Sequence, residues 1–292
     1  MRIARYRAGE RVELGVTDGQ AMASITNNIT GAGSDMIALI ENWDEIRPLA
    51  ETLMQSPDYR LKDVELLAPI ERPGKIWGIG LNYADHAAEA SIALPEHQTW
   101  FVKASTAING PFDPVERPAV SSALDYEAEL VAVMGRRGRH ISEKDAPTAI
   151  FGYCVGNDVS VRDWQLRTGQ FSIGKSFDTH APIGPWIVTA DELDPMALSI
   201  RSFVNGEIRQ NSNTSQLIFS PAQQVAHLSQ AMTLEPGDLL FTGTPGGVGA
   251  AMQPPQFLAE GDVVRVEIDG IGHIENKVVG APGNVGSTGL VK

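Results

Sequence analysis

Asp125-Tyr126-Glu127-Ala128-Glu129-Leu130-Val131-Ala132-Val133-Met134 is the stretch that decides most about this protein. Its apolar, β-branched second half is typical of a buried strand, in which alternate side chains share one face. Glu127 and Glu129 are therefore expected on the same face as Val131 and Val133. Two neighbouring carboxylates on a buried face repel each other and lose hydration, which costs several kcal/mol per ion unless a cation compensates. A metal ion would compensate both; the alternative is a solvated strand end with both glutamates facing water.

A third carboxylate, Asp158, follows the apolar run of residues 150–157, where a second buried strand is expected to leave the sheet. Active-site residues are common at such strand ends. If a helix follows, Asp158, Arg162 and Gln165 are spaced i, i+4 and i+7 and share one face of it. The alternative role for Asp158 is a helix N-cap. Three carboxylates without cysteine or an obvious histidine ligand make an all-oxygen site, which suits Mg²⁺, Mn²⁺ or Ca²⁺ better than Zn²⁺ or Cu²⁺.

Two further groups of residues carry chemistry. On a short helix His86 and Glu89 are i, i+3 neighbours, so the carboxylate can orient the imidazole and raise its basicity as a general-base dyad. The alternative is a surface His–Glu pair. Lys175 lies among small and apolar residues, where an ammonium needs a negative partner. The alternative interpretation is that Lys175 is a solvated lysine in a loop.

Residues 242–249 form a Gly-rich stretch after an expected strand, but they lack the Gly-Lys-Ser/Thr ending of a phosphate-binding P-loop. We interpret them as a tight loop that lets the backbone approach a ligand, with Thr244 offering a hydroxyl. Cys154 lies inside an apolar run and is expected in the core. No role is assigned to His97, His140, His180, His227 and His273.

Apolar runs and breakers predict an α+β, β-rich fold in two parts. Residues 1–70 are expected to form a small N-terminal α+β domain with strands near Ile3 and over 12–16, and a helix from Asp44. Pro69 and Pro73 mark the boundary to a strand-rich domain over 71–280, and residues 281–292 form a Gly-rich tail. In the larger domain we expect strands over residues 76–81, 130–134, 149–155, 183–188, 238–241 and 263–268, and helices over 83–90, 159–167 and 221–232.

Composition excludes several classes of protein. The 292 residues carry 23 Lys and Arg against 36 Asp and Glu, a formal charge of −13 that disfavours nucleic-acid binding. One cysteine permits no internal disulfide, and no apolar run reaches the roughly 20 residues of a membrane helix. The N-terminus has no apolar core of a secretory signal. We therefore expect a cytoplasmic protein with no nucleic-acid or membrane partner.

Five motifs together resemble the fumarylacetoacetate hydrolase family of metal-dependent C–C hydrolases, isomerases and decarboxylases. In chain order they are Gly80-Leu81-Asn82-Tyr83-Ala84-Asp85-His86, Asp125-Tyr126-Glu127-Ala128-Glu129-Leu130, Gly156-Asn157-Asp158-Val159-Ser160-Val161-Arg162-Asp163-Trp164-Gln165, Gly174-Lys175-Ser176-Phe177 and Thr242-Gly243-Thr244-Pro245. The resemblance implies a mixed β-roll catalytic domain behind the smaller N-terminal domain, and a homodimer.

The resemblance also assigns roles to residues. It implies that Glu127, Glu129 and Asp158 bind Mg²⁺ or Mn²⁺, with Ca²⁺ as a substitute in a crystal, and that His86 with Glu89 activates water on a mobile lid. It implies that developing negative charge is stabilised by Arg162, Gln165 and Lys175, and that the substrate is contacted by Tyr83 and Thr244.

The expected reaction is hydrolysis of the C–C bond of a 2,4-diketo acid (acylpyruvate), giving pyruvate or a related keto acid and a carboxylic acid. The ion would act as a Lewis acid, His86 would take a proton from water, and the cationic and amide side chains would stabilise the oxyanion. The alternatives are an isomerase or a decarboxylase of a 2-oxo dicarboxylate, and a non-catalytic protein that binds small acids or metal ions.

Overall fold

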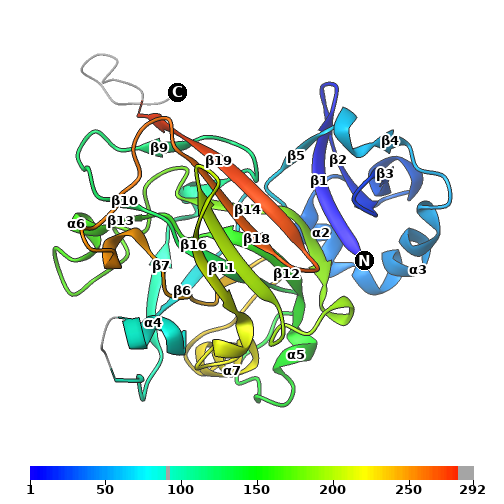
Figure 1. The fold of residues 1–292 in the computed structure, drawn as a ribbon. Coiled ribbons are helices and arrows are strands. Elements are labelled where there is room, and N and C mark those ends of the chain that lie inside the picture. The colour runs from blue at the N-terminus through cyan, green and yellow to red at the C-terminus, as the bar shows by residue number, and fades with distance from the viewer. Residues whose placement is uncertain (90–92, 282–292) are drawn as a thin grey trace, which may run out of the picture.

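The computed structural model describes residues 1–89 and 93–281, and its centre is one large twisted sheet (Figure 1). The strands follow the order β4-β3-β2-β1-β14-β12-β11-β17-β6-β7. Two short strands lie off this path: β5 pairs with β1, and β8 pairs with β14. Their bounds are β1 Arg2–Ala8, β2 Arg11–Thr17, β3 Ala21–Ser24, β4 Tyr59–Arg60, β5 Glu65–Leu67, β6 Ile76–Gly80, β7 Thr99–Lys103, β8 Ile108–Asn109, β11 Ala128–Met134, β12 Ile150–Asn157, β14 Ala181–Thr189 and β17 Leu239–Phe241.

The central strands β11, β12 and β14 are buried along their whole length. A second, five-stranded sheet in the order β16-β15-β18-β19-β9 packs against them. In β15 and β18 buried residues alternate with less buried ones, the pattern of a sheet with one face on the core. The bounds are β9 Val115–Arg117, β15 Ser199–Val204, β16 Glu207–Asn213, β18 Val263–Ile268 and β19 Gly272–Gly280, and a separate pair is formed by β10 Leu124–Asp125 and β13 Ser160–Val161.

The helices are short and lie outside the sheets. They are α1 Ile25–Asn28, α2 Met36–Glu41, α3 Trp43–Leu53, α4 Ala84–Glu89, α5 Ala146–Ala149, α6 Arg162–Gln165 and α7 Pro221–Ala231. Helix α7 begins with a capping box between Ser220 and Gln223, which satisfies backbone donors at its first turn. Within the described residues no helix combines the length and the hydropathy that crossing a bilayer requires.

Most of the predicted elements are confirmed, and the fold is α+β and β-rich as expected. The helix expected over 159–167 is confirmed only over residues 162–165. The segment first pairs as strand β13 with β10, through Leu124↔Val161 and Asp125↔Ser160. Helix α6 has only four residues, and its N-cap is Val161. Asp158 is therefore neither a helix N-cap nor on a helix face with Arg162 and Gln165. Residue 90, the expected end of the helix that carries His86, lies outside the described residues.

The large sheet continues across the segment around Pro69 and Pro73. Strand β1 pairs antiparallel with β14, through Arg2↔Val188 and Ile3↔Ile187. One apolar cluster contains buried side chains from both parts of the chain, among them Ile3, Leu14, Ile187 and Phe241. Of the expected C-terminal tail over 281–292, residues 282–292 lie outside the described part of the chain.

Candidate active site

The three predicted metal ligands converge. One ligand oxygen from each of Glu127, Glu129 and Asp158 lies within 4.8 Å of the other two. Pairing of β11 with β12 sets Glu129 opposite Gly156, and the Asp158 amide donates to the Glu127 carbonyl at 2.9 Å. The three residues are 7%, 1% and 0% exposed in the order Glu127, Glu129, Asp158, so the alternative of a solvated strand end is wrong.

Cationic side chains neutralise two of these carboxylates. Lys175 Nζ donates to Glu127 Oε2 and to Asp158 Oδ2, both at 2.7 Å, and Arg162 Nη1 donates to Glu127 Oε1 at 2.6 Å. Burial alone raises the pKa of Glu127, but the charges of Lys175 and Arg162 outweigh it and lower the pKa to about 2. Lys175 is 1% exposed, so it is not a solvated loop lysine.

Lys103 is a third buried cation, which the sequence interpretation missed. Its Nζ lies 2.5 Å from Asp158 Oδ1, and the residue is 1% exposed. It comes from the last position of the edge strand β7, and a single lysine 55 residues before its partner gives no local signal in the sequence.

Glu129 is the carboxylate of this cluster that no cationic side chain contacts in the described part of the chain. Its Oε2 accepts one hydrogen bond, from the Gly243 amide at 2.8 Å. Burial, and then the charges of Asp158 and Glu127, raise its pKa well above the ordinary value. A buried carboxylate in this position needs a cation, and the all-oxygen donor set fits a hard divalent ion such as Mg²⁺ or Mn²⁺. The residues present therefore fit the metal ion that the sequence predicts.

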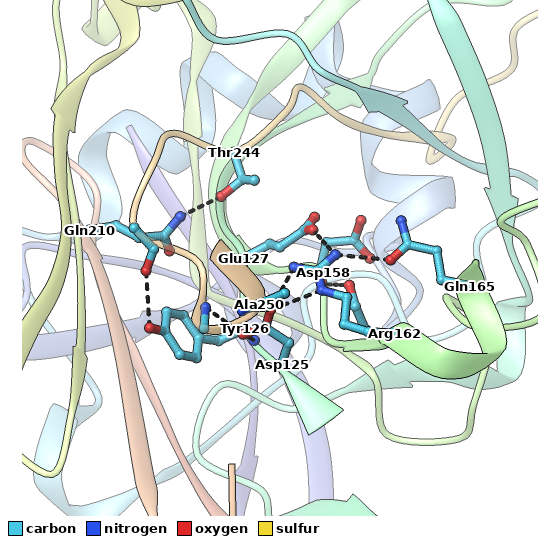
Figure 2. Close-up of polar contacts among 12 residues, drawn as sticks. Asp125, Tyr126, Glu127, Asp158, Arg162, Gln165, Gln210, Thr244 and Ala250 are labelled. Atoms are coloured by element: carbon cyan, nitrogen blue, oxygen red, sulfur yellow. Dashed lines mark hydrogen bonds and ion pairs between the residues drawn. The ribbon is translucent and has the colours of Figure 1, made fainter. Parts of the chain in front are cut away.

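Asp125 fixes the guanidinium of Arg162 (Figure 2). It accepts from Arg162 Nε at 2.8 Å and from the backbone amides of Gly249 and Ala250 at 2.9 and 3.0 Å. Sequence reasoning missed this role, although Asp125 is the first residue of the decisive stretch. Gln165 accepts from Arg162 Nη1 through its amide oxygen at 2.9 Å, which leaves the Gln165 amide nitrogen on the side away from Arg162 (Figure 2).

The predicted dyad lies on α4. His86 Nδ1 and Glu89 Oε2 are 3.4 Å apart, and both side chains are partly exposed. Glu89 is also held by the Gly247 amide, 3.1 Å from each of its carboxylate oxygens. The Gly-rich loop of residues 242–249 therefore contacts Glu129 through Gly243 and the dyad through Gly247.

The two predicted substrate contacts are both buried polar side chains. The Tyr83 hydroxyl has no hydrogen-bond partner among the described residues. Burial and the nearby charges of Glu129 and Asp85 raise its pKa, so it remains protonated and able to donate. Thr244 Oγ1 accepts from Gln210 Nε2 at 2.7 Å (Figure 2). Gln210 was not predicted, and its Oε1 accepts from the Ala128 amide at 2.9 Å, which links the loop to β11.

Cys154 is buried in β12, as expected for a core residue, and burial raises its thiol pKa to about 12. The thiolate is therefore not populated near neutral pH, and Cys154 has no place in the candidate chemistry.

Comparison with known proteins identifies the relatives of this chain. Residues 75–279 match the family described as fumarylacetoacetate (FAA) hydrolase C-terminal, and residues 1–69 match the family described as Rv2993c-like, N-terminal. Oxaloacetate tautomerase fahd2, mitochondrial, of Xenopus laevis is 40% identical over 288 residues, covering 96% of this chain and 90% of that protein.

Two solved structures share the fold over nearly their whole length. Fumarylacetoacetate hydrolase from Exiguobacterium antarcticum superposes with a TM-score of 0.87 at 38% identity, covering 96% of this chain and 100% of that one. Maleylpyruvate hydrolase from Sphingobium sp. SYK-6, solved with manganese(II) and pyruvate, gives a TM-score of 0.83 at 33% identity, covering 97% and 100%. With the buried acidic site in place, these matches show that the chain belongs to the fumarylacetoacetate hydrolase family.

Proposed function

We propose that this protein is a divalent-metal-dependent tautomerase, which interconverts the enol and keto forms of a 2-oxo dicarboxylate of the oxaloacetate class. The observation that carries the proposal is the convergence of Glu127, Glu129 and Asp158, in which no cationic side chain of the described residues contacts Glu129. The substrate class is supported by the relative named oxaloacetate tautomerase, which matches almost the whole chain. These comparisons favour the isomerase alternative over the hydrolase expected from the sequence.

The charges of the cluster favour an anionic ligand once a divalent ion is present. Four buried carboxylates, Asp125, Glu127, Glu129 and Asp158, face three cations, and with their ordinary charges the sum is −1. The cations are Lys103, Arg162 and Lys175. A divalent ion changes the sum to +1, which attracts a 2-oxo acid electrostatically.

The chain supplies a base and several donors for the reaction. A bound divalent ion would polarise the 2-oxo group of the substrate as a Lewis acid. In the direction from enol to keto, His86, held by Glu89, takes the proton of the enol hydroxyl and then delivers it to the adjacent carbon, so that the proton is conserved. Lys175 uses two of its three N–H bonds on Glu127 and Asp158, so the third remains for negative charge that develops on the substrate.

Tyr83 and Gln165 complete the donor set. The unpartnered Tyr83 hydroxyl and the outward Gln165 amide nitrogen each offer a hydrogen bond to a carboxylate or an enolate oxygen. Both side chains are buried or nearly so, and a hydrogen bond there is stronger than the same bond in water.

Hydrolysis of an acylpyruvate is the second candidate. The His86–Glu89 pair also suits removal of a proton from water, which would attack the distal carbonyl and release a carboxylic acid and pyruvate. The solved maleylpyruvate hydrolase, which is similar over 97% of this chain, supports this alternative.

The two candidates separate in one pair of assays. Purified protein with Mn²⁺ or Mg²⁺ is mixed with enol-oxaloacetate, and loss of the enol absorbance is followed against buffer and metal alone. In parallel, pyruvate release is measured from acylpyruvates. We expect rapid ketonisation, which a chelator abolishes. We expect His86→Asn to lose most of its kcat and to retain metal binding. The control His140→Asn, which alters an exposed histidine, is expected to leave kcat unchanged.

If ketonisation proceeds no faster than in buffer and pyruvate is released from acylpyruvates, the tautomerase proposal is contradicted and the hydrolase is supported. The absence of both activities, in protein shown to bind Mn²⁺, would contradict both candidates.

A further inference from the structure

Helix α4 is too short to be stable alone, so contacts outside it decide where His86 lies. Its carboxylates make those contacts. Asp85 Oδ2 accepts a hydrogen bond from the Ser212 hydroxyl, and Asp85 Oδ1 accepts from the Gly246 amide at 3.4 Å. Inside the helix, Asp85 Oδ1 also accepts from the His86 amide at 2.7 Å. At the other end of the helix, Glu89 is held by the Gly247 amide.

Ser212 lies on β16, on the strand face that also carries Gln210. Gln210 is completely buried, and its amide nitrogen donates to Thr244 Oγ1 and to the Pro245 carbonyl at 2.7 and 2.8 Å. Its oxygen accepts from the Ala128 amide, next to the two metal-ligand glutamates. One face of β16 therefore contacts the helix of the dyad, the Gly-rich loop and the strand of the metal site.

We propose that Ser212, through its hydrogen bond to Asp85, is a positioning residue that fixes α4 and sets the place of His86 relative to the acidic cluster. In the described residues the Ser212 hydroxyl makes no other hydrogen bond. Substitution of Ser212 therefore removes this contact without removing another. The catalytic part of the inference rests on the proposed function, whereas the fixing of α4 does not.

The test uses three variants of the full chain. Ser212→Ala removes the hydroxyl, Ser212→Thr keeps it, and Asn211→Ala alters an exposed neighbour on the opposite face of the same strand. Hydrogen–deuterium exchange of the peptide covering residues 84–89 is measured first, without substrate. We expect exchange of the Ala87 amide, which donates to the Tyr83 carbonyl, to become about tenfold faster in Ser212→Ala only, as loss of one charge-assisted hydrogen bond allows.

Activity and metal binding are then measured on the same proteins. We expect kcat for enol ketonisation to fall about tenfold in Ser212→Ala, with KM and the Mn²⁺ titration midpoint unchanged, and Ser212→Thr to restore it. A general loss of structure would instead change the thermal midpoint and metal binding together.

Exchange in Ser212→Ala equal to that of the wild type would overturn the inference, whatever the activity. Faster exchange with unchanged kcat in an active enzyme would overturn the positioning of His86. The wild type itself could show neither activity while Ser212→Ala still exchanges faster than the wild type. That result would support the fixing of α4 and reject the proposed function.

Discussion

Glu129 shows at the scale of one residue why the acidic cluster needs a ligand. Glu127 and Asp158 obtain hydrogen bonds from Lys175, Arg162 and Lys103. Within residues 1–89 and 93–281, Glu129 obtains only that of the Gly243 amide. Removing one partner of a buried ion pair leaves an uncompensated charge, which destabilises a fold far more than loss of a surface pair. Without a cation, Glu129 is in that uncompensated state whenever it is ionised.

Glu129→Gln is expected to stabilise the metal-free protein and to abolish its response to metal. Because the pKa of Glu129 is raised in the folded state, protonation of Glu129 favours the folded wild type fully below the ordinary pKa of 4.5. The folded wild type loses this stability as the pH rises through the pKa of Glu129 in the folded state. The gain in the variant, about 1–3 kcal/mol, is therefore larger at alkaline than at acidic pH. Urea unfolding with and without Mn²⁺ measures both effects. The exposed Glu143→Gln is the control, and a Mn²⁺-dependent stabilisation that survives in Glu129→Gln would refute this assignment.

His180 predicts a second pH effect of opposite sign. It is fully buried, with Nε2 donating to the Glu116 carbonyl at 2.8 Å, and burial lowers its pKa to about 4. At a pH between the folded-state pKa of His180 and its ordinary pKa of 6.5, His180 is protonated in the unfolded chain and neutral in the folded protein. The free energy of unfolding therefore falls as the pH falls. Through His180, lowering the pH from about 7 to about 5 reduces the free energy of unfolding by about 2 kcal/mol.

Replacement of His180 by Gln, which keeps an amide donor, is expected to reduce this loss of stability. The free energy of unfolding is measured at both pH values, with the exposed His140→Gln as control. An unchanged pH slope in His180→Gln would show that carboxylates alone cause the acid sensitivity.

At the scale of elements, the Gly-rich loop of residues 242–249 makes contacts that the sequence interpretation did not include. Its amides donate to Glu129, Asp85 and Glu89, and its geometry requires glycine at Gly247. The approach of its backbone to a ligand stays a prediction. Gly247 has φ of +99°, and a Cβ there would lie 2.1 Å from the Arg209 carbonyl oxygen.

Gly247→Ala is expected to displace the loop and release Glu89, lowering kcat at least about tenfold. Gly270→Ala is the matched control, because Gly270 also has positive φ, +82°, but no atom lies within 4 Å of the added Cβ. The control is expected to lose about 1 kcal/mol of stability and no activity. Equal kcat in the two variants would contradict a role of the loop in holding the dyad.

At the scale of the whole molecule, the N-terminal segment shares a sheet and a core with the remainder. The pairing of β1 with β14 and the common apolar cluster bury side chains from both parts. Removing either part would expose a strand edge and an apolar surface, so neither part gains its full stability alone.

We therefore expect one cooperative unfolding transition for the chain. Calorimetry is expected to give equal calorimetric and van't Hoff enthalpies, and far-ultraviolet circular dichroism is expected to follow the same curve as tryptophan fluorescence. Two separated transitions would show that the parts over residues 1–70 and 71–280 are independent domains.

The sequence by itself predicted most of the strands and the carboxylates of the cluster, and it favoured a hard divalent ion. Apolar runs bounded by Gly and Pro located β6, β11, β12, β14, β17 and β18, because hydrophobic periodicity and chain breakers act locally. Glu127 and Glu129 could be identified because a buried strand with two acids is costly without a cation.

Only the tertiary structure decided which side chains meet these acids. Lys103 reaches the site from β7, Asp125 from β10, and Gln210 and Ser212 from β16. These three strands belong to three different sheets, and no local spacing records such contacts. The same pairing made residues 160–161 a strand where local spacing favoured a helix. Long-range pairing outweighs local propensity because it buries side chains and satisfies backbone groups that an isolated segment would leave to water.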